Sequence, residues 1–462
     1  MNSRSTKRVL LALSAVWLSV YACYKPREVN PTEKAPAYYA GGINTTFESG
    51  VSAYSVLTPV LSAAANADHF AGDAIFHAAF DEGDGAFGGL GPLFIQRSCE
   101  NCHQFNGRSH PPFDKGDNST GFLLRLSVAG ESSNGGPLGV THFGTQLQTE
   151  ATAGNEVEGR FLITWENVVM NYPDGSSVTL RQPYYTIYNN YQSLPNDLLR
   201  SGRNASALIG LGLLEAIPDE DLLALEDVGD ADGDYISGIA NRVWNPETGQ
   251  LDVGRFGWKS GTATLIQQTA DAFHQDMGIT SEGLFPVEAC SGQSNCNGAN
   301  ETPDLNTEEL RVTAFYLKSL AVPAPRNLED PEVKRGKQLF QELNCSGCHV
   351  PQWQTGYSPY PFLSNQTIYP YTDLLIHDLG EGLGDGRPEF LASANDWRTS
   401  PLWGIGLAKI VNPEGTFLHD GRARTLEEAI LWHGGEAVWS RNDFMSLPAE
   451  DRQALIAFLE SL

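Results

Sequence analysis

The sequence predicts a mainly α-helical fold with long irregular loops and one small β-hairpin. Apolar residues recur at helical spacing in residues 307–320 and 333–343, and again in the last stretch, which Pro448 opens. The chain also contains 47 glycines and 26 prolines, which indicate long loops between the helices. The pair Asp174-Gly175, between polar and β-prone runs, predicts the hairpin.

The composition is that of a large acidic chain. Its 462 residues are 41% hydrophobic, which is enough to bury extensive cores, and the length suggests two or three folding units. The 30 Lys and Arg against 56 Asp and Glu give a formal net charge of −26. This charge argues against nucleic acids and against anionic membrane surfaces as partners.

The first residues have the pattern of a targeting segment. A basic stretch, residues 4–8, precedes an apolar run, 9–20, that is too short to span a bilayer comfortably. We therefore expect a signal peptide over 1–22, cleaved before Cys23, and the same cut fits a lipid anchor on Cys23. Residues 23–50 are rich in Pro, Gly, Thr and Asn and are expected to form a tether. The prediction is an exported, periplasmic protein, lipid-anchored to a bacterial membrane.

Two identical cysteine motifs carry the chemistry. The pattern C-x-x-C-H occurs at 99–103 and again at 345–349, and it is the attachment signal of c-type haem. The two thiols bind the haem vinyl groups, and the adjacent histidine binds the iron. A redox dithiol and half of a zinc site are the alternatives, but two motifs in an exported chain favour two covalent haems c. The predicted haem-binding residues are Cys99, Cys102, His103, Cys345, Cys348 and His349.

Two further cysteines, Cys290 and Cys296, lie on either side of a loop rich in Gly, Ser and Asn. In an oxidising compartment they are expected to form a local disulfide.

Helices near both motifs suggest two cytochrome c-like domains. Apolar residues at helical spacing precede the second motif, and the terminal helix from Pro448 has the right place to cross it. The matching helix for the first motif is 307–320, which a proline-rich linker follows. The predicted domains are therefore 51–326, with about 200 residues inserted after the motif, and 327–462.

From Gly88 to Leu462 the chain resembles the di-haem oxidoreductases once labelled thiol oxidoreductases, which are relatives of the bacterial di-haem cytochrome c peroxidases. The stretches that carry the resemblance are 91–94, 146–148, 210–218, 255–259, 276–281, 377–380 and 419–422. The resemblance implies one haem in each of two cytochrome c-like domains. One haem would feed electrons and the other would meet a substrate such as peroxide.

The second ligand of the C-terminal haem is predicted to be His433. Thr425 opens a helix with the pattern of a capping box, and this helix ends at His433, just before two glycines. In the peroxidase relatives a similar stretch ends in a Met ligand, so a His here implies a lower haem potential and puts peroxidase chemistry in doubt. The alternatives are His377, His419 and Met445.

The second ligand of the N-terminal haem has several candidates. The histidines that qualify as ligands are His69, His77, His110 and His142. In the peroxidase relatives a Leu-x-x-Gln-Ala stretch and a nearby Glu line the peroxide side, and residues 147–151 are similar here. Glu150 is therefore the predicted catalytic acid–base group, ahead of Glu156 and Glu158. All three are alternatively ordinary surface acids of an acidic protein.

Two more features suggest function. Asp230, Asp232 and Asp234 place carboxylates at alternate positions of a turn, which suits Ca²⁺, and a solvated acidic turn is the alternative. Some relatives have a Trp relay two residues before the second motif, where this chain has Leu343. Trp258 is the candidate relay here.

Together these features predict a peroxidase-like di-haem oxidoreductase. Electrons from a small donor protein, of cytochrome or cupredoxin type, would enter at the His349 haem and reach a small-molecule oxidant at the His103 haem. Two alternatives stay open: a di-haem electron carrier without substrate chemistry, and an oxidase of a protein or thiol partner.

Overall fold

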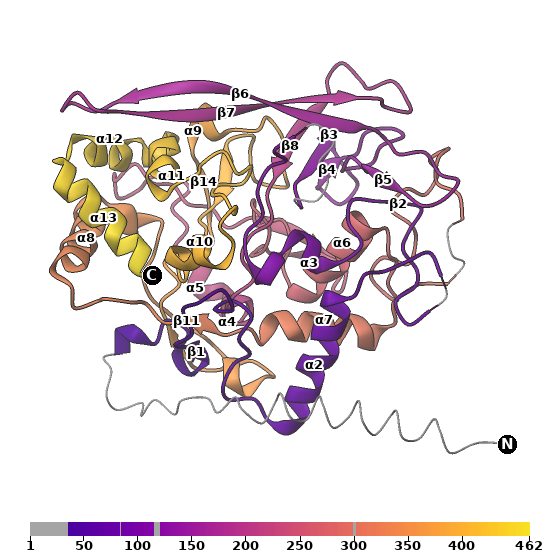
Figure 1. The fold of residues 1–462 in the computed structure, drawn as a ribbon, viewed down its shortest axis with the longest axis horizontal. Coiled ribbons are helices and arrows are strands. Elements are labelled where there is room, and N and C mark those ends of the chain that lie inside the picture. Colours follow the sequence, from indigo (N-terminus) through magenta and orange to yellow (C-terminus); the bar gives the residue numbers. More distant parts are fainter. Residues whose placement is uncertain (1–35, 84, 115–120, 299–301) are drawn as a thin grey trace. The chain divides into compact units, whose positions relative to one another are not determined.

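The structure, a computed structural model, describes residues 36–83, 85–114, 121–298 and 302–462 (Figure 1). Its contacts divide the chain into Met1–Tyr38 and Tyr39–Leu462. Of the first unit only one short 3₁₀ turn, Pro36–Tyr38, is described. The predicted signal peptide and Cys23 lie outside the described residues. Within the described ranges, no helix is long and apolar enough to cross a membrane.

The prediction of a mainly α-helical fold is wrong, because helices account for 30% of the chain and strands for 19%. The fold is mixed α/β with irregular loops. Many of the strands have only two to five residues, too few for a period of two to be visible in the sequence. No sheet in the described part has more than three strands.

The helices and strands are distributed along the whole described chain. The helices are α2 (Ala63–His77), α3 (Cys99–Cys102), α4 (Leu211–Glu215), α5 (Asp219–Leu223), α6 (Leu265–Met277), α7 (Thr307–Lys318), α8 (Pro331–Glu342), α9 (Gly380–Leu383), α10 (Ala408–Val411), α11 (Leu426–Trp432), α12 (Val438–Ser446) and α13 (Ala449–Ser461). The strands are β1 (Thr45–Thr46), β2 (Leu93–Phe94), β3 (Leu123–Glu131), β4 (Pro137–Leu138), β5 (Glu150–Ala151), β6 (Arg160–Asn171), β7 (Ser177–Tyr188), β8 (Leu199–Arg203), β9 (Arg242–Asn245), β10 (Gln250–Val253), β11 (Val322–Pro323), β12 (Trp353–Gln354), β13 (Thr367–Ile368), β14 (Ile376–Asp378) and β15 (Asp396–Arg398).

A hairpin does form at Asp174-Gly175, and it is longer than the sequence suggested. Its strands β6 and β7 have 12 residues each and lie along the top of Figure 1. Gly175 has a φ of 86°, which a glycine adopts at little cost. The Arg181 guanidinium donates to the carbonyl oxygens of Gly421 and Arg422, so the hairpin is held on a loop far away in the sequence.

Two pairs of packed helices include the helices that precede the two motifs. Helix α2 packs on α7, and α8 packs on α13, where the rings of Phe340 and Phe458 lie 5.3 Å apart. Each pair has a glycine at its crossing. A Cβ on Gly72 would lie 2.0 Å from the Val312 carbonyl oxygen, and one on Gly336 would lie 1.9 Å from that of Ala454. Both crossings therefore require the absence of a side chain.

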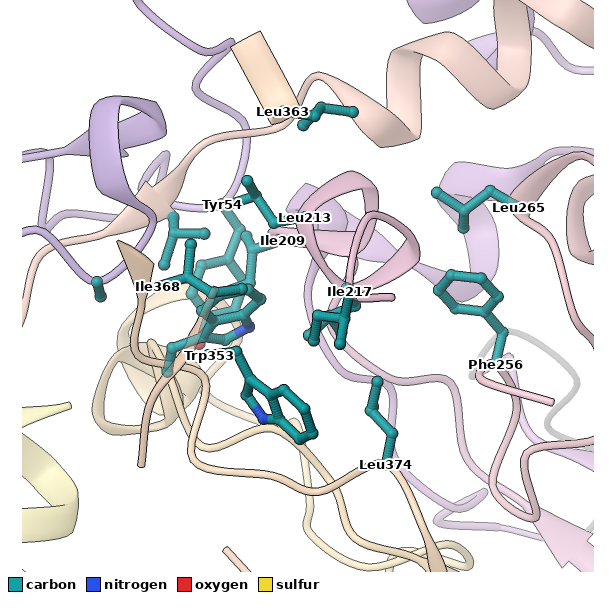
Figure 2. Close-up of a cluster of buried hydrophobic side chains, with 14 of the residues drawn as sticks. Tyr54, Ile209, Leu213, Ile217, Phe256, Leu265, Trp353, Leu363, Ile368 and Leu374 are labelled. Atoms are coloured by element: carbon teal, nitrogen blue, oxygen red, sulfur yellow. The ribbon is translucent and has the colours of Figure 1, made fainter. Parts of the chain in front are cut away.

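The largest apolar cluster draws on both halves of the chain (Figure 2). It joins Tyr54, Leu213 and Phe256 to Trp353 and Leu374, all of them buried. Residues on either side of position 326 thus share one core. The predicted boundary near residue 326 stays a prediction.

Two stretches expected to be irregular contribute a small parallel ladder. Thr45–Thr46, in the range 23–50 predicted as a tether, pairs with Val322–Pro323, in the predicted linker after residue 320. Asn44 and Val322 are buried, so both stretches take part in the core.

Gly336→Ala is expected to destabilise the protein, although alanine is normally the better helix residue by about 0.5–1 kcal/mol. The new Cβ would meet the Ala454 carbonyl, and we expect a net loss of about 1–3 kcal/mol. Thermal unfolding of the holoprotein measures it. Gly382→Ala, also inside a helix, is the control, because its Cβ would make an ordinary contact of 3.7 Å with Trp432. Equal stability of the two variants would contradict the crossing argument.

Candidate haem sites

The first motif forms a short helix at the wall of a large cavity. The Ser98 hydroxyl caps α3 by accepting the N–H of Asn101. Cys99, Cys102 and His103 line a cavity of about 810 Å³, and neither cysteine forms a disulfide. Two thiols and one imidazole therefore face one space, as covalent attachment of a haem requires.

The His103 ring is held by a distant carbonyl. Its Nδ1 lies 2.8 Å from the carbonyl oxygen of Ser206, so Nδ1 donates and Nε2 is left to bind a metal. Burial lowers the pKa of His103 to about 4, which keeps the imidazole neutral, the form that ligates iron.

The second motif follows the same pattern in a tighter space. Cys345, Cys348 and His349 line a cavity of about 180 Å³. The Nδ1 of His349 lies 2.9 Å from the carbonyl oxygen of Tyr371, and burial lowers the pKa of His349 to about 4. Again Nε2 is the nitrogen left for a metal.

The two alternatives to haem fit these thiols less well. A redox dithiol needs a lowered pKa, whereas burial raises the pKa of Cys99 and of Cys345 to about 12. A zinc site needs four ligands. In the described part of the chain, Cys348 is the only cysteine within a cluster of potential ligands, with Asp373 and His377. Both ring nitrogens of His377 are already 2.8 Å from carboxylate oxygens.

His433 lines the same cavity as His349. It follows α11, where one half of the predicted capping box is present, since the Thr425 hydroxyl accepts the N–H of Glu428. The Glu428 carboxylate accepts the N–H of Arg424 instead of that of Thr425. The His433 Nδ1 lies 2.8 Å from the Ala429 carbonyl oxygen, which leaves its Nε2 for a metal. Burial lowers the pKa of His433. The geometry is therefore compatible with one iron between two imidazoles.

Two rivals of His433, His377 and His419, line the same cavity, but other side chains already engage their rings. The two nitrogens of His377 are held by Asp373 and Glu436. His419 stacks on Trp397 with 3.6 Å between ring centroids. Met445 does not line the cavity. The ligand role of His433 stays a prediction.

None of the four other histidines reaches the first cavity. His69 bonds the Ser319 hydroxyl at 2.8 Å, and His110 stacks on Phe113. The histidines that fail to line the cavity are His69, His77, His110 and His142. Among the described residues, His103 is the only histidine that lines it, so this site shows no second imidazole.

Glu150 lies outside the first cavity. On β5 it pairs in register with Phe94 of β2, and its carboxylate lies 3.3 Å from the Arg160 guanidinium. Its catalytic role stays a prediction. The acids that do line the cavity are Asp271, Asp276 and Glu389.

Of these three acids, Asp276 is the best candidate for a proton acceptor near neutral pH. Burial raises the pKa of its carboxyl to about 6, while Arg125 and a hydrogen bond from the Gln146 amide oppose the rise. The Asp276 carbonyl accepts the N–H groups of Ile95 and Gln96, which places the residue beside the first motif. The sequence contained a signal for it, because Asp276 begins one of the stretches that carry the family resemblance.

Five arginines, three of them buried, also line the first cavity and were not anticipated. They are Arg108, Arg125, Arg203, Arg387 and Arg398. Five arginines exceed the three acids in an otherwise acidic protein. Within the described residues, Arg203 Nη1 and Arg387 Nε are buried without a hydrogen-bond acceptor. A haem has two propionate groups, so these unpaired donors and the excess of positive charge fit it.

Trp258, the predicted relay, lines both cavities, as do Arg108 and Arg398. Its indole N–H donates to the Asn204 carbonyl at 2.8 Å, and its ring lies 6.5 Å from that of His419. The side chain thus stands between the two sites.

The predicted calcium turn brings two of its three predicted acids together with a third, Asp227, that was not predicted. Potential ligand atoms of Asp227, Asp230 and Asp232 lie within 4.8 Å of one another. Asp234 instead accepts the N–H of Ile236. Calcium binding stays a prediction.

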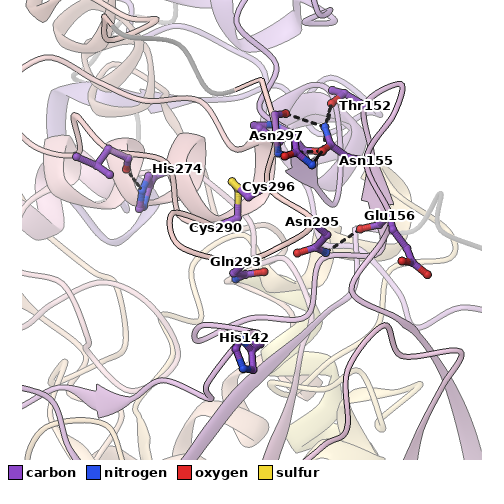
Figure 3. Close-up of a disulfide and its surroundings, with 12 residues drawn as sticks. His142, Thr152, Asn155, Glu156, His274, Cys290, Gln293, Asn295, Cys296 and Asn297 are labelled. Atoms are coloured by element: carbon purple, nitrogen blue, oxygen red, sulfur yellow. Dashed lines mark hydrogen bonds between the residues drawn. A yellow bond between two sulfur atoms is a disulfide. The ribbon is translucent and has the colours of Figure 1, made fainter.

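Cys290 and Cys296 form the predicted disulfide (Figure 3). The loop it closes contacts the segment after β5, where the Asn295 amide donates to the Glu156 carbonyl at 2.7 Å. Next to it, the Asn297 N–H donates to the Asn155 side chain at 2.9 Å.

Comparisons with known proteins agree with the chemistry of the motifs. A family model described as "Di-haem oxidoreductase, putative peroxidase" matches residues 35–462. No curated protein matches. Among solved structures, hydrazine synthase of Kuenenia stuttgartiensis, pressurised with xenon, is similar at 13% identity over 95% of this chain and 100% of that chain, with a TM-score of 0.32. That TM-score carries no argument about fold or function.

Between pH 5 and pH 8, the Glu158→Gln variant is expected to lose less stability than the unmodified protein. Burial raises the pKa of Glu158 to about 8, so folding favours its protonated form. The stabilisation by protonated Glu158 is fully present below the unfolded pKa of about 4.3 and is lost as pH rises through 8, by up to about 5 kcal/mol. Denaturant unfolding at pH 5 and pH 8 should show a smaller difference in the variant. Identical pH profiles would mean that Glu158 is ionised when buried.

Two histidine ligands on the second haem predict that no Met–iron charge-transfer band appears in near-infrared magnetic circular dichroism. His433→Met should introduce that band and raise the potential of this haem, because a thioether stabilises the ferrous state. A band in the unmodified protein that disappears in Met445→Leu would show that Met445 is the ligand.

Proposed function

Because the chain belongs to the di-haem oxidoreductase family, we propose that it is an exported, peroxidase-like enzyme with two covalently attached haems. A small oxidant is reduced at the His103 site, and electrons arrive through the His349 site. The bound haems supply the one-electron chemistry, and the protein supplies access, orientation and a proton.

The difference between the two cavities carries this proposal. The first has about 810 Å³ and the second about 180 Å³, although each must hold the same group. Four histidines line the second cavity, and two of them, His349 and His433, bond a backbone carbonyl through Nδ1 and keep Nε2 for a metal. If His349 and His433 both bound one iron, that iron would have no position for a substrate, whereas the first site has room for one.

Asp276 is the proposed acid–base group of the first site. Its pKa of about 6 allows the carboxylate to accept a proton from a bound oxidant near neutral pH and to return it to the leaving oxygen. A hydrogen bond from the Gln146 amide holds the carboxylate in place, and the charge of Arg125 favours its ionised form. Glu150, which is paired with Arg160, is the competing assignment.

Trp258 is proposed to conduct electrons between the sites, since it lines both cavities. The hydrogen bond to the Asn204 carbonyl fixes the indole plane.

The donor is proposed to be a small redox protein, of cytochrome or cupredoxin type, outside the cytoplasm. The disulfide Cys290–Cys296 and the signal-like residues 1–22 support export. A lipid on Cys23 would tether the protein to the membrane. A structural Ca²⁺ at Asp230 and Asp232 together with Asp227 belongs to the same proposal.

An electron carrier without substrate chemistry is the second candidate. The pair His349 and His433 favours it, because two imidazoles suit fast electron transfer better than catalysis. The large first cavity opposes it. Nothing in the described residues specifically favours oxidation of a protein or thiol partner.

Stopped-flow mixing of the half-reduced holoprotein with H₂O₂ tests the proposal, after mass spectrometry has shown two haem additions. The spectral change should arise at the His103 haem. The rate should rise with pH through about 6, since the Asp276 carboxylate is the active form. Asp276→Asn should slow the reaction about 10²–10⁴-fold and remove the pH limb.

Glu150→Gln is the matched control and should react normally. If it slows instead, Glu150 is the acid–base group. If the change arises at the His349 haem, or if neither haem reacts, the carrier function replaces the enzyme.

A further inference from the structure

Two large aromatic side chains are exposed side by side. Tyr235 is 63% exposed and Trp439 is 58% exposed, and their ring centroids lie 6.2 Å apart. They come from a loop and from α12, about 200 residues apart in the sequence. Neither has a role in the core, and exposed aromatic pairs of this kind are typical of binding surfaces.

This pair stands on the wall of the second cavity. Ile236, next to Tyr235, lines the cavity and packs against the motif, because a Cβ on Gly347 would lie 2.4 Å from its Cδ1. The Asn344 amide, just before the motif, donates to the Asp234 carboxylate at 3.3 Å. Ser440, next to Trp439, lines the cavity too. The surface is therefore built directly over the second site.

The backbone presents Tyr235 in an unusual way. Its φ is 69°, a left-handed conformation that costs a bulky residue about 1–3 kcal/mol. The loop holds it there through side-chain bonds to backbone N–H groups. Asp230 accepts from Tyr235 at 3.0 Å, and Asp232 accepts from Asp234 at 3.1 Å. Strain that the surroundings maintain is common at functional surfaces.

Acidic side chains surround the aromatic pair. Asp232 and Asp234 are exposed on the same loop, and Asp443 is exposed four residues after Trp439, on the same face of α12. Tyr235, Trp439, Asp232, Asp234 and Asp443 form what we call the aromatic–acidic patch. The charge of the whole chain is also −26, so a basic partner is attracted, whereas a second copy or an anionic membrane is repelled.

We propose that the aromatic–acidic patch is the docking surface for a small redox protein with a basic contact face. The proposal rests on the proposed function, because it identifies the surface through which electrons enter. In each encounter one electron leaves the reduced partner, which is oxidised, and passes to the second site of this chain, while no covalent bond forms or breaks.

Isothermal titration calorimetry with both proteins fully oxidised tests the docking without any electron flow. The probe is a basic cytochrome c, and the holoprotein is used. Tyr235→Ser and Trp439→Ser should each raise Kd at least tenfold, as aromatic residues at an interface centre do. The double variant Asp232→Asn with Asp234→Asn should weaken the dependence of Kd on salt.

Two controls isolate the patch. Tyr357→Ser removes another tyrosine, 87% exposed and outside the second cavity, and should leave Kd unchanged. The same cytochrome with succinylated lysines has reversed charge and should not bind.

An unchanged Kd in both aromatic variants would overturn the proposal. So would a dimer of this chain, seen by sedimentation, that Trp439→Ser dissociates. Failure of the proposed function has a different signature: the second haem would be absent, or dithionite would reduce it and H₂O₂ would then react with neither haem.

Discussion

One hydrogen bond at each site sets the geometry on which the rest of the structure depends. The motif histidine donates through Nδ1 to a backbone carbonyl, from Ser206 at the first site and from Tyr371 at the second. This bond fixes the tautomer and directs Nε2 into the cavity. The Ser206 carbonyl lies 103 residues after His103, so the strands between them must return to the motif. The β3–β8 ladder makes that return possible.

Local chemistry was predictable from the sequence, and long-range placement was not. The cysteine motifs, the disulfide, the turn at Asp174-Gly175 and the capping by Thr425 depend on neighbouring residues, and the structure has each of them in place. The fold class failed because strands such as β2 have two residues and gain their stability from a partner distant in sequence. The approach of Asp276 to the first motif is a contact of the same long-range kind.

Charge is distributed against the trend of the whole chain. The protein has a net charge of −26, yet arginines outnumber acids around the first cavity. Burying a guanidinium is costly unless carboxylates neutralise it. Arg203 has two such partners, Asp385 at 3.3 Å and Glu389 at 3.4 Å, and still keeps one nitrogen without an acceptor. A cluster that remains incomplete in the protein alone is what a group with two carboxylates would complete.

The two sites begin from the same five-residue pattern, so the pattern itself does not decide which one meets a substrate. The difference lies on the opposite side of each cavity. At the second site a single short helix, α11, brings His433 to face the motif, and the space that remains is small. At the first site the walls come from segments far apart in the sequence, including Asp276 on α6 and Glu389 near β15, and the space is large. One short helix is sufficient to supply a second ligand and leave little free space. A cavity large enough for a substrate instead needs walls from several segments that do not pack directly against one another. The segment between the first motif and α7 supplies most of the residues that line the first cavity, and later segments such as the one that contains Glu389 supply others.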